Sequence, residues 1–187
     1  MRTMKTGLKS LLFCFVLGLS AQTSWAQFDM FLELDGIQGE SLDQQHQGWI
    51  ELLSFSSGIG RAVSSGSSGG PREVGNVNFS DITVTKTLDR ASVPLRQAIT
   101  QGQNIPFARI EFTKSAGGGQ RVTFFEIMLD NVIVSSISTS AASGGSIPVE
   151  SLSLNFTKIE WTYKQMDETG KVQGETSGSW DLATGKQ

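Results

Sequence analysis

Residues 152–163 read Leu-Ser-Leu-Asn-Phe-Thr-Lys-Ile-Glu-Trp-Thr-Tyr. From Leu152 to Phe156 apolar and polar residues alternate, which is the pattern of a β-strand with one buried face. Ile159 and Trp161 resume the alternation after a shift of one residue. Such a shift predicts a β-bulge between the two halves, and bulges help a sheet to curve.

Strand patterns also dominate the sequence on both sides of this segment. Further strands are expected at 30–35, 49–55, 77–84, 107–112 and 122–137. After residue 163, the run 167–171 reads as a hairpin turn in which Gly170 supplies a positive φ. The weakly apolar residues 172–182 would then return as an edge strand.

One helix interrupts the strands. Ser92 can cap its start and Pro94 suits its first turn, while Leu95 and Ala98 stand at helical spacing. Gly102 is a suitable C-terminal stop. We therefore expect a mainly β fold with one short α-helix of about three turns.

Two stretches of low complexity separate the expected strands. Residues 56–70 contain a Ser/Gly tract, and residues 135–146 form a second, smaller one. Both compositions are typical of flexible loops. A loop as long as 56–70 in a compact domain is usually functional or disordered.

The first 26 residues have the composition of a secretory signal. Three positive residues precede an apolar run at 11–19, and Ser24 and Ala26 provide small residues before a cut between Ala26 and Gln27. An uncleaved anchor is the alternative, but the run is shorter than the roughly 20 residues of a membrane span. We therefore expect a signal peptide at 1–26, a single domain at 27–187, a secreted or periplasmic location, and no membrane contact after cleavage.

Composition excludes several classes of function. The formal net charge is -3 and the isoelectric point about 5.2, so the sequence offers no basic surface for nucleic acid. Cleavage would remove Cys14, the only cysteine, and with it any disulfide, thiol nucleophile or thiolate ligand.

The remaining residues form no recognisable catalytic set. His46 is the only histidine, and its polar surroundings predict a solvent-exposed or locally hydrogen-bonded loop residue. Residues 66–70 match the G-x-S-x-G pattern, but within a Ser/Gly tract that lacks the strand and helix of a nucleophile elbow. Glu33 and Asp35 read as the solvated face of a strand. We therefore predict a protein that is not an enzyme, with no catalytic, cofactor-binding or metal-binding residues.

Four segments, in this order, carry a resemblance to a known family. They are 31–41 (FLELDGIQGES), 46–55 (HQGWIELLSF), 81–95 (DITVTKTLDRASVPL, with Val93 inserted) and 150–163 (ESLSLNFTKIEWTY). Their order and spacing are similar to those of the Hcp tube proteins of type VI secretion systems. The resemblance spans residues 31–163.

The resemblance implies a two-sheet antiparallel β-barrel with one short helix, assembling as a homohexameric ring. Rings of the family stack into a tube that a contractile sheath fires. A spike protein caps this tube, and its bore can carry effectors. The resemblance also implies that the protein has no catalytic residues and no cofactor. It implies assembly in the cytoplasm, whereas the predicted signal peptide indicates export. Arg61 and Val63, in the loop that corresponds to a ring-stacking loop, are the residues expected to contact a neighbouring ring.

A second hypothesis stays open. The same barrel could serve as a secreted monomeric binding module for a carbohydrate, lipid or surface partner, without a role in a secretion tube. Ring formation distinguishes this alternative from the first, because a binding module would remain a monomer.

Overall fold

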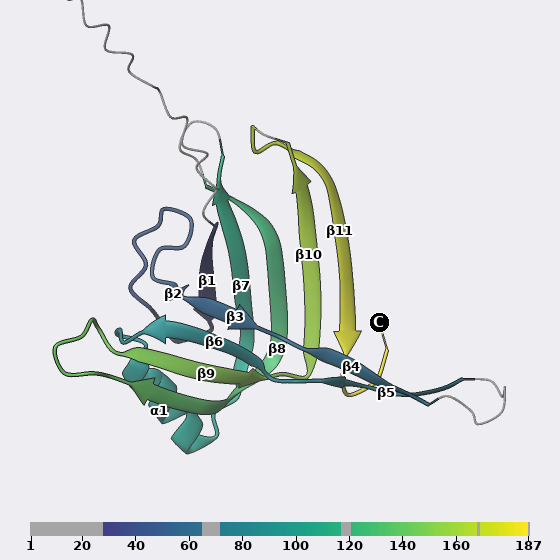
Figure 1. Cartoon of the computed structure of the whole chain (residues 1–187), viewed down its shortest axis with the longest axis horizontal. Coiled ribbons are helices and arrows are strands. Elements are labelled where there is room, and N and C mark those ends of the chain that lie inside the picture. The colour runs from purple at the N-terminus through teal and green to yellow at the C-terminus, as the bar shows by residue number, and fades with distance from the viewer. Residues whose placement is uncertain (1–27, 65–71, 117–120, 168, 187) are drawn as a thin grey trace, which may run out of the picture.

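The computed structural model describes residues 28–64, 72–116, 121–167 and 169–186 (Figure 1). The signal segment 1–26, the cut between Ala26 and Gln27 and the G-x-S-x-G match at 66–70 lie outside these residues. The elements follow the order β1 (Phe28–Leu34), β2 (Ile50–Leu52), β3 (Ser54–Ser56), β4 (Ile59–Ser64), β5 (Glu73–Phe79), β6 (Ile82–Thr87), α1 (Ser92–Gln101), β7 (Ile105–Ser115), β8 (Arg121–Ser140), β9 (Val149–Asn155), β10 (Lys158–Met166) and β11 (Val172–Asp181).

The strands pair antiparallel along the path β2-β1-β7-β8-β9-β6-β3, and β10 and β11 extend from β8. In Figure 1, β7, β8, β10 and β11 run side by side, while β6 and β9 cross below them. The mainly β, two-sheet fold with one short helix is thus confirmed. The ladders do not close into a continuous ring: β2 and β3, at the two ends of the path, are joined through Leu53, whose N–H donates to the Thr85 carbonyl oxygen at 2.7 Å.

Strand β8 connects the two sheets. Its first part pairs with β7 and β10, and from Ile133 onward it pairs with β9. The change of partner follows Asn131, which has a φ of 51°, a left-handed conformation that asparagine tolerates better than most residues. The Asn131 side chain donates to the Thr157 hydroxyl at 3.0 Å, so the bend in β8 is tied to the facing chain.

The prediction of a β-bulge between Phe156 and Ile159 is wrong, because the two halves are separate strands. Strand β9 ends at Asn155 and β10 begins at Lys158, so the shift in periodicity marks the passage of the chain from one sheet to the other. Both Phe156 and Ile159 are buried. The two halves of the decisive segment therefore contribute to one core from two different sheets.

The core lies between the sheets and under the helix. Strand β6 alternates strictly between buried and half-buried residues, and its Ile82 and Val84 join Leu152 and Leu154 of β9 in the interior. The helix α1 begins at Ser92 and ends before Gly102, which has a φ of 60°, as expected. Ser92 does not act as its cap, because the capping position is Ala91. No helix in the described ranges is long and apolar enough to span a bilayer.

Both predicted flexible loops were wrong in part. Within 56–70, residues Ile59–Ser64 form β4, which pairs with β5 because its residues face apolar partners, as in Val63 opposite Val74 and Ile59 opposite Phe79. Within 135–146, β8 continues to Ser140 by pairing with β9. Serine and glycine indicate low complexity, but they do not prevent backbone pairing when a partner strand is adjacent.

The C-terminal hairpin is as predicted. The N–H of Asp167 donates to the Lys171 carbonyl at 3.0 Å, and Gly170 has a φ of 84°. Strand β11 pairs with β10 alone among the described strands and so forms an edge. Trp161 of β10 is half-buried, with its ring stacked 6.2 Å from that of Phe79.

Replacement of this tryptophan tests the packing between β5 and β10. We expect Trp161→Ala to lower the free energy of unfolding by about 2 kcal/mol, less than the roughly 3–5 kcal/mol of a fully buried aromatic. Urea unfolding followed by circular dichroism measures it. Tyr163→Ala is the matched control, since Tyr163 is 50% exposed two residues along the same strand. Equal losses for the two variants would contradict the packing described.

Candidate functional site

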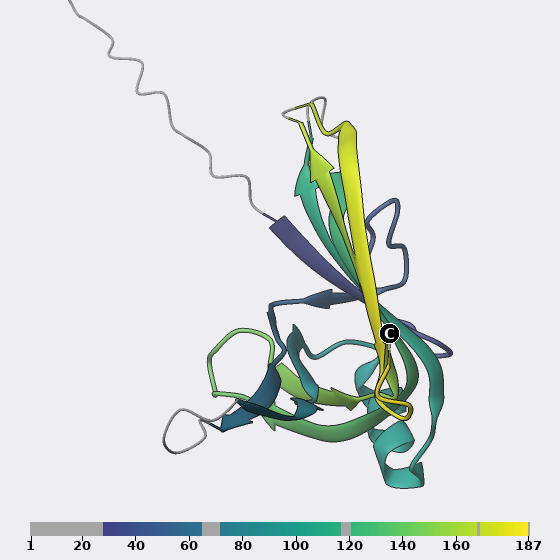
Figure 2. The same ribbon diagram turned by 90° about the vertical axis from the view of Figure 1, so that its right-hand side faces the viewer.

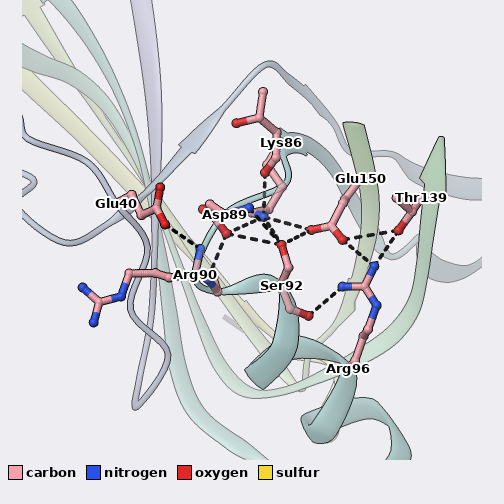
Figure 3. Close-up of polar contacts among 10 residues, drawn as sticks. Glu40, Lys86, Asp89, Arg90, Ser92, Arg96, Thr139 and Glu150 are labelled. Atoms are coloured by element: carbon pink, nitrogen blue, oxygen red, sulfur yellow. Dashed lines mark hydrogen bonds and ion pairs between the residues drawn. The ribbon is translucent and has the colours of Figure 1, made fainter. Parts of the chain in front are cut away.

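A cluster of charged side chains is buried where β6, β9 and the start of α1 meet (Figure 3). The ammonium of Lys86 lies 2.9 Å from a carboxylate oxygen of Glu150 and 2.6 Å from one of Asp89. The side chains of Lys86 and Glu150 are completely buried. Lys86 also donates to the carbonyl oxygen of Thr87 at 2.8 Å and to the hydroxyl of Ser92 at 3.1 Å.

Ser92 and Arg96 complete the cluster from the helix. The Ser92 hydroxyl donates to Glu150 at 2.6 Å and accepts from the N–H of Asp89 at 3.0 Å. Arg96 donates to the second carboxylate oxygen of Glu150 at 2.6 Å and to the carbonyl oxygen of Ser92 at 2.7 Å. The helix is therefore fixed to both strands by polar contacts that no isolated helix cap would supply.

The electrostatics of the cluster favour the charged form of Glu150. Burial opposes ionisation, but hydrogen bonds from Ser92, Lys86 and Arg96 outweigh it and lower the pKa of Glu150 from 4.5 to about 2. The carboxylate thus stays ionised throughout the physiological range. Its contribution to stability is present above about pH 4.5 and is lost as the pH falls toward 2.

In the sequence, this cluster is indicated by two charged residues that continue apolar strand faces. Lys86 follows Ile82 and Val84 on the buried face of β6, and Glu150 precedes Leu152 on the buried face of β9. A charge that continues an apolar face must find a partner of opposite sign. The register places Lys86 directly opposite Glu150, which only knowledge of the strand pairing could show.

His46 forms the centre of a second buried cluster. Its Nδ1 lies 2.6 Å from Asp43 and its Nε2 lies 3.1 Å from Glu111 of β7. The ring stacks on Phe31, with 4.2 Å between ring centroids, and meets the edge of Trp49. The expected local hydrogen bond is confirmed in Asp43. The expected solvent exposure is wrong, since His46 is only 1% exposed; the reason is the contact with Glu111, which is 65 residues away in sequence.

The polar groups of both clusters are occupied by one another. In the part of the chain that the structure describes, every buried side-chain nitrogen and oxygen has a hydrogen-bond partner, and no group of three or more metal-ligating side chains is found. Glu33 and Asp35 line an open groove of about 800 Å³ together with Trp49 and Arg90. Asp35 is exposed and Glu33 half-buried, as expected for a solvated face.

The two predicted assembly residues lie on a separate feature, the arm formed by β4 and β5. Figure 1 shows the arm extending beyond the other strands, and in Figure 2 the arm points toward the viewer. Its two strands pair with each other and with no other described strand. Arg61 and Val63 are both exposed on β4, and the structure brings neither of them near the buried clusters.

The chain is similar in sequence to proteins of type VI secretion systems. The family described as "Type VI secretion system effector, Hcp" matches residues 31–163. Protein hcp1 of Pseudomonas aeruginosa is 32% identical over 155 residues, which cover 82% of this chain and 94% of that protein.

Solved structures of type VI secretion proteins have the same fold. The structure of a type six secretion system protein superposes with a TM-score of 0.80 and 36% identity, covering 86% of this chain and 99% of the other. The crystal structure of Hcp1 from Salmonella typhimurium gives a TM-score of 0.70 and 26% identity, covering 87% and 99%.

The buried ion pair predicts a large and specific loss on mutation. We expect Lys86→Met to destabilise the protein by about 3 kcal/mol, the lower end of the range for a broken buried pair, because Glu150 and Asp89 lose the ammonium while Arg96 still contacts Glu150. Lys158→Met is the matched control: its pair with Asp130 is nearly half exposed on both sides, so the expected loss is below about 1 kcal/mol. Urea denaturation measures both. Similar values for the two variants would show that the cluster is not a main constraint on the fold.

Proposed function

The chain belongs to the Hcp family of type VI secretion system proteins, and from that premise we propose that its subunits close into homohexameric rings that stack through the β4–β5 arm. As a member of this family it is a structural component of a secretion machine. The observation that supports assembly most directly is the arm itself. It carries exposed apolar side chains on two strands whose backbones pair only with each other among the described strands.

The apolar face of the arm can be traced from the register. Ile59 stands opposite Phe79 and Val63 opposite Val74, and the register shifts between Arg61 and Val63. Along β4 itself, alternation places Ile59, Arg61 and Val63 on one face. The side chains of Ile59, Val63 and Val74 are between 56% and 59% exposed. A two-stranded hairpin is at best marginally stable in water, and an apolar face on it is stabilised when another surface covers it. A second copy of the chain provides such a surface.

Contacts between the subunits of a ring would cover both the arm and the edge strand β11. Strand β11 presents unpaired backbone groups at an edge, and such edges promote uncontrolled pairing unless they are covered. Heterologous contacts that close by rotation would cover surfaces of this kind without leaving ends. We propose Arg61 and Val63 as the residues of the arm that contact the neighbouring ring.

The partners and the absence of catalysis follow from the same proposal. A spike protein, a sheath and effector cargo are the partners that a tube subunit would have. The only histidine is enclosed by two carboxylates and two aromatic rings, where it cannot reach a substrate. This burial supports a non-catalytic role without a cofactor.

Assembly is tested by a charge placed on either face of the arm. Light scattering of the wild-type protein should give the mass of six subunits, with larger species at high concentration. Val63→Asp should keep the hexamer and lose the larger species, because it buries a carboxylate between rings. Asn78→Asp is the matched control, since Asn78 stands opposite Gly60 and so points to the other face of the arm.

The outcomes separate the alternatives. If Val63→Asp dissociates the hexamer itself, the arm belongs to the contact within the ring and the stacking role is wrong. If the wild type is a monomer at every concentration, the monomeric binding module replaces the ring.

Export is proposed on the sequence pattern of residues 1–26, which precedes the family match at residue 31. We expect the mature protein, 27–187, to begin at Gln27 and to be secreted or periplasmic. Intact-mass measurement on protein from the native host gives the N-terminus, and Ala26→Arg, which places a large charge at the cut, should leave the segment attached. A wild-type chain that still begins at Met1 in the cytoplasm would overturn export and leave an ordinary tube subunit.

A further inference from the structure

His46 holds a loop closed by touching a carboxylate on each side, and we propose that this contact is a pH-dependent latch that opens the tip of the loop, residues 42–47, when the imidazole loses its proton. The inference concerns the loop alone and does not depend on ring formation. It starts from the two distances at the ring nitrogens, 2.6 Å to Asp43 and 3.1 Å to Glu111.

Counting donors shows why the protonated ring is required. An ionised carboxylate only accepts hydrogen bonds, and a neutral imidazole has one N–H and one bare nitrogen. Only the imidazolium can donate to Asp43 and Glu111 together. After deprotonation one ring nitrogen faces a carboxylate with lone pair against lone pair, in a position where water has no access, since the His46 side chain is 2% exposed.

The charged groups around His46 reinforce this arrangement. Glu111 lies on β7 and accepts a hydrogen bond from Thr123 of β8. Arg121, also on β8, reaches Asp43 at 3.4 Å and Asp29 of β1 at 2.7 Å. Arg121 can keep Asp43 ionised through its ion pair, whereas Glu111 has only the more distant positive charge of Arg109. Glu111 is therefore the carboxylate that loses most when His46 becomes neutral.

Burial disfavours the charged imidazole, but the hydrogen bonds to Glu111 and Asp43 outweigh it, so the pKa of His46 is raised above 6.5. The sign follows from linkage: a group whose pKa is higher in the closed state stabilises that state below its ordinary pKa. This stabilisation is lost as the pH rises through the closed-state pKa. The latch is therefore closed at pH values below the raised pKa of His46 and opens above it.

The backbone confines the opening to the tip of the loop. The N–H of Gly39 donates to the Gly48 carbonyl at 2.8 Å, and the N–H of Ser41 donates to the Trp49 carbonyl at 3.0 Å. Gly39 also packs so closely on Trp49 that a Cβ there would lie 2.3 Å from its carbonyl oxygen. These contacts do not titrate, so the base stays closed. The tip depends on Asp43, which accepts from the N–H of His46 at 3.2 Å as well as from its ring.

Opening would alter an exposed apolar site. Leu42, at the tip, is 89% exposed and stands next to Asp43, so its position is set by the latch. The pH would thereby control how the protein presents one of its most exposed apolar side chains. No change in the two sheets is required.

The test combines two measurements on the full protein between pH 5.5 and 9. NMR follows the imidazole, which needs no assignment because His46 is the only histidine. Hydrogen exchange of the amides in the loop tip, corrected for the intrinsic effect of pH, gives the opening equilibrium. We expect a midpoint above 6.5, and an opening constant that rises about tenfold for every unit by which the midpoint exceeds the ordinary pKa.

Two variants distinguish the latch from general loosening. Glu111→Gln should lower the midpoint and keep the loop closed in alkali, because an amide N–H can donate to the bare imidazole nitrogen. Glu160→Gln, the same substitution on β10 two strands away from β7, should change neither quantity. The proposal is overturned if the wild-type opening constant is independent of pH, if the midpoint is at or below 6.5, or if Glu111→Gln behaves as the wild type does.

Discussion

The ion pair between Lys86 and Glu150 is the constraint on which the rest of the structure depends. It joins two strands that face each other in register, and through Ser92 and Arg96 it fixes the helix to both. A buried pair of this kind contributes little net stability, because removing two charges from water costs about as much as their attraction returns. Its effect is on specificity. A slip of one residue between β6 and β9 would turn one charge out of the interior and leave the other unpaired.

Features whose cause is local could be predicted from the sequence, whereas features that depend on distant residues could not. The helix, the C-terminal hairpin and most strands follow from local patterns, such as the turn at Gly170, because their cause lies within a few neighbouring residues. The expected strands 49–55 and 77–84 are each divided into two, since the chain changes its pairing partner within them. The burial of His46 and the pairing of Lys86 with Glu150 depend on residues more than sixty positions apart. A local pattern shows that a charge lies on an apolar face, but not which strand will face it.

The prediction of a flexible loop at 56–70 was wrong at β4 for a related reason. The Ser/Gly composition of this segment is typical of a loop, and β4 exists only because β5 lies beside it and supplies Val74 and Phe79 as opposite residues. Phe79 also stacks on Trp161 and Trp180 at the base of the arm. The contacts of Phe79 therefore hold β5 at the base of the arm, and β4 forms by pairing with β5 although its own sequence has low β-strand propensity.

Buried polar side chains and exposed apolar ones have different roles in this protein. The groups able to do chemistry, His46 and the cluster around Lys86, are inside and fully hydrogen-bonded to one another. The arm exposes the apolar side chains of Ile59, Val63 and Val74 beside polar ones such as Arg61. Buried charges with matched partners specify one register and resist change, whereas exposed apolar side chains gain free energy only from contact with another surface. A chain built in this way can act through the surfaces it presents, and the buried charges act by keeping those surfaces in place.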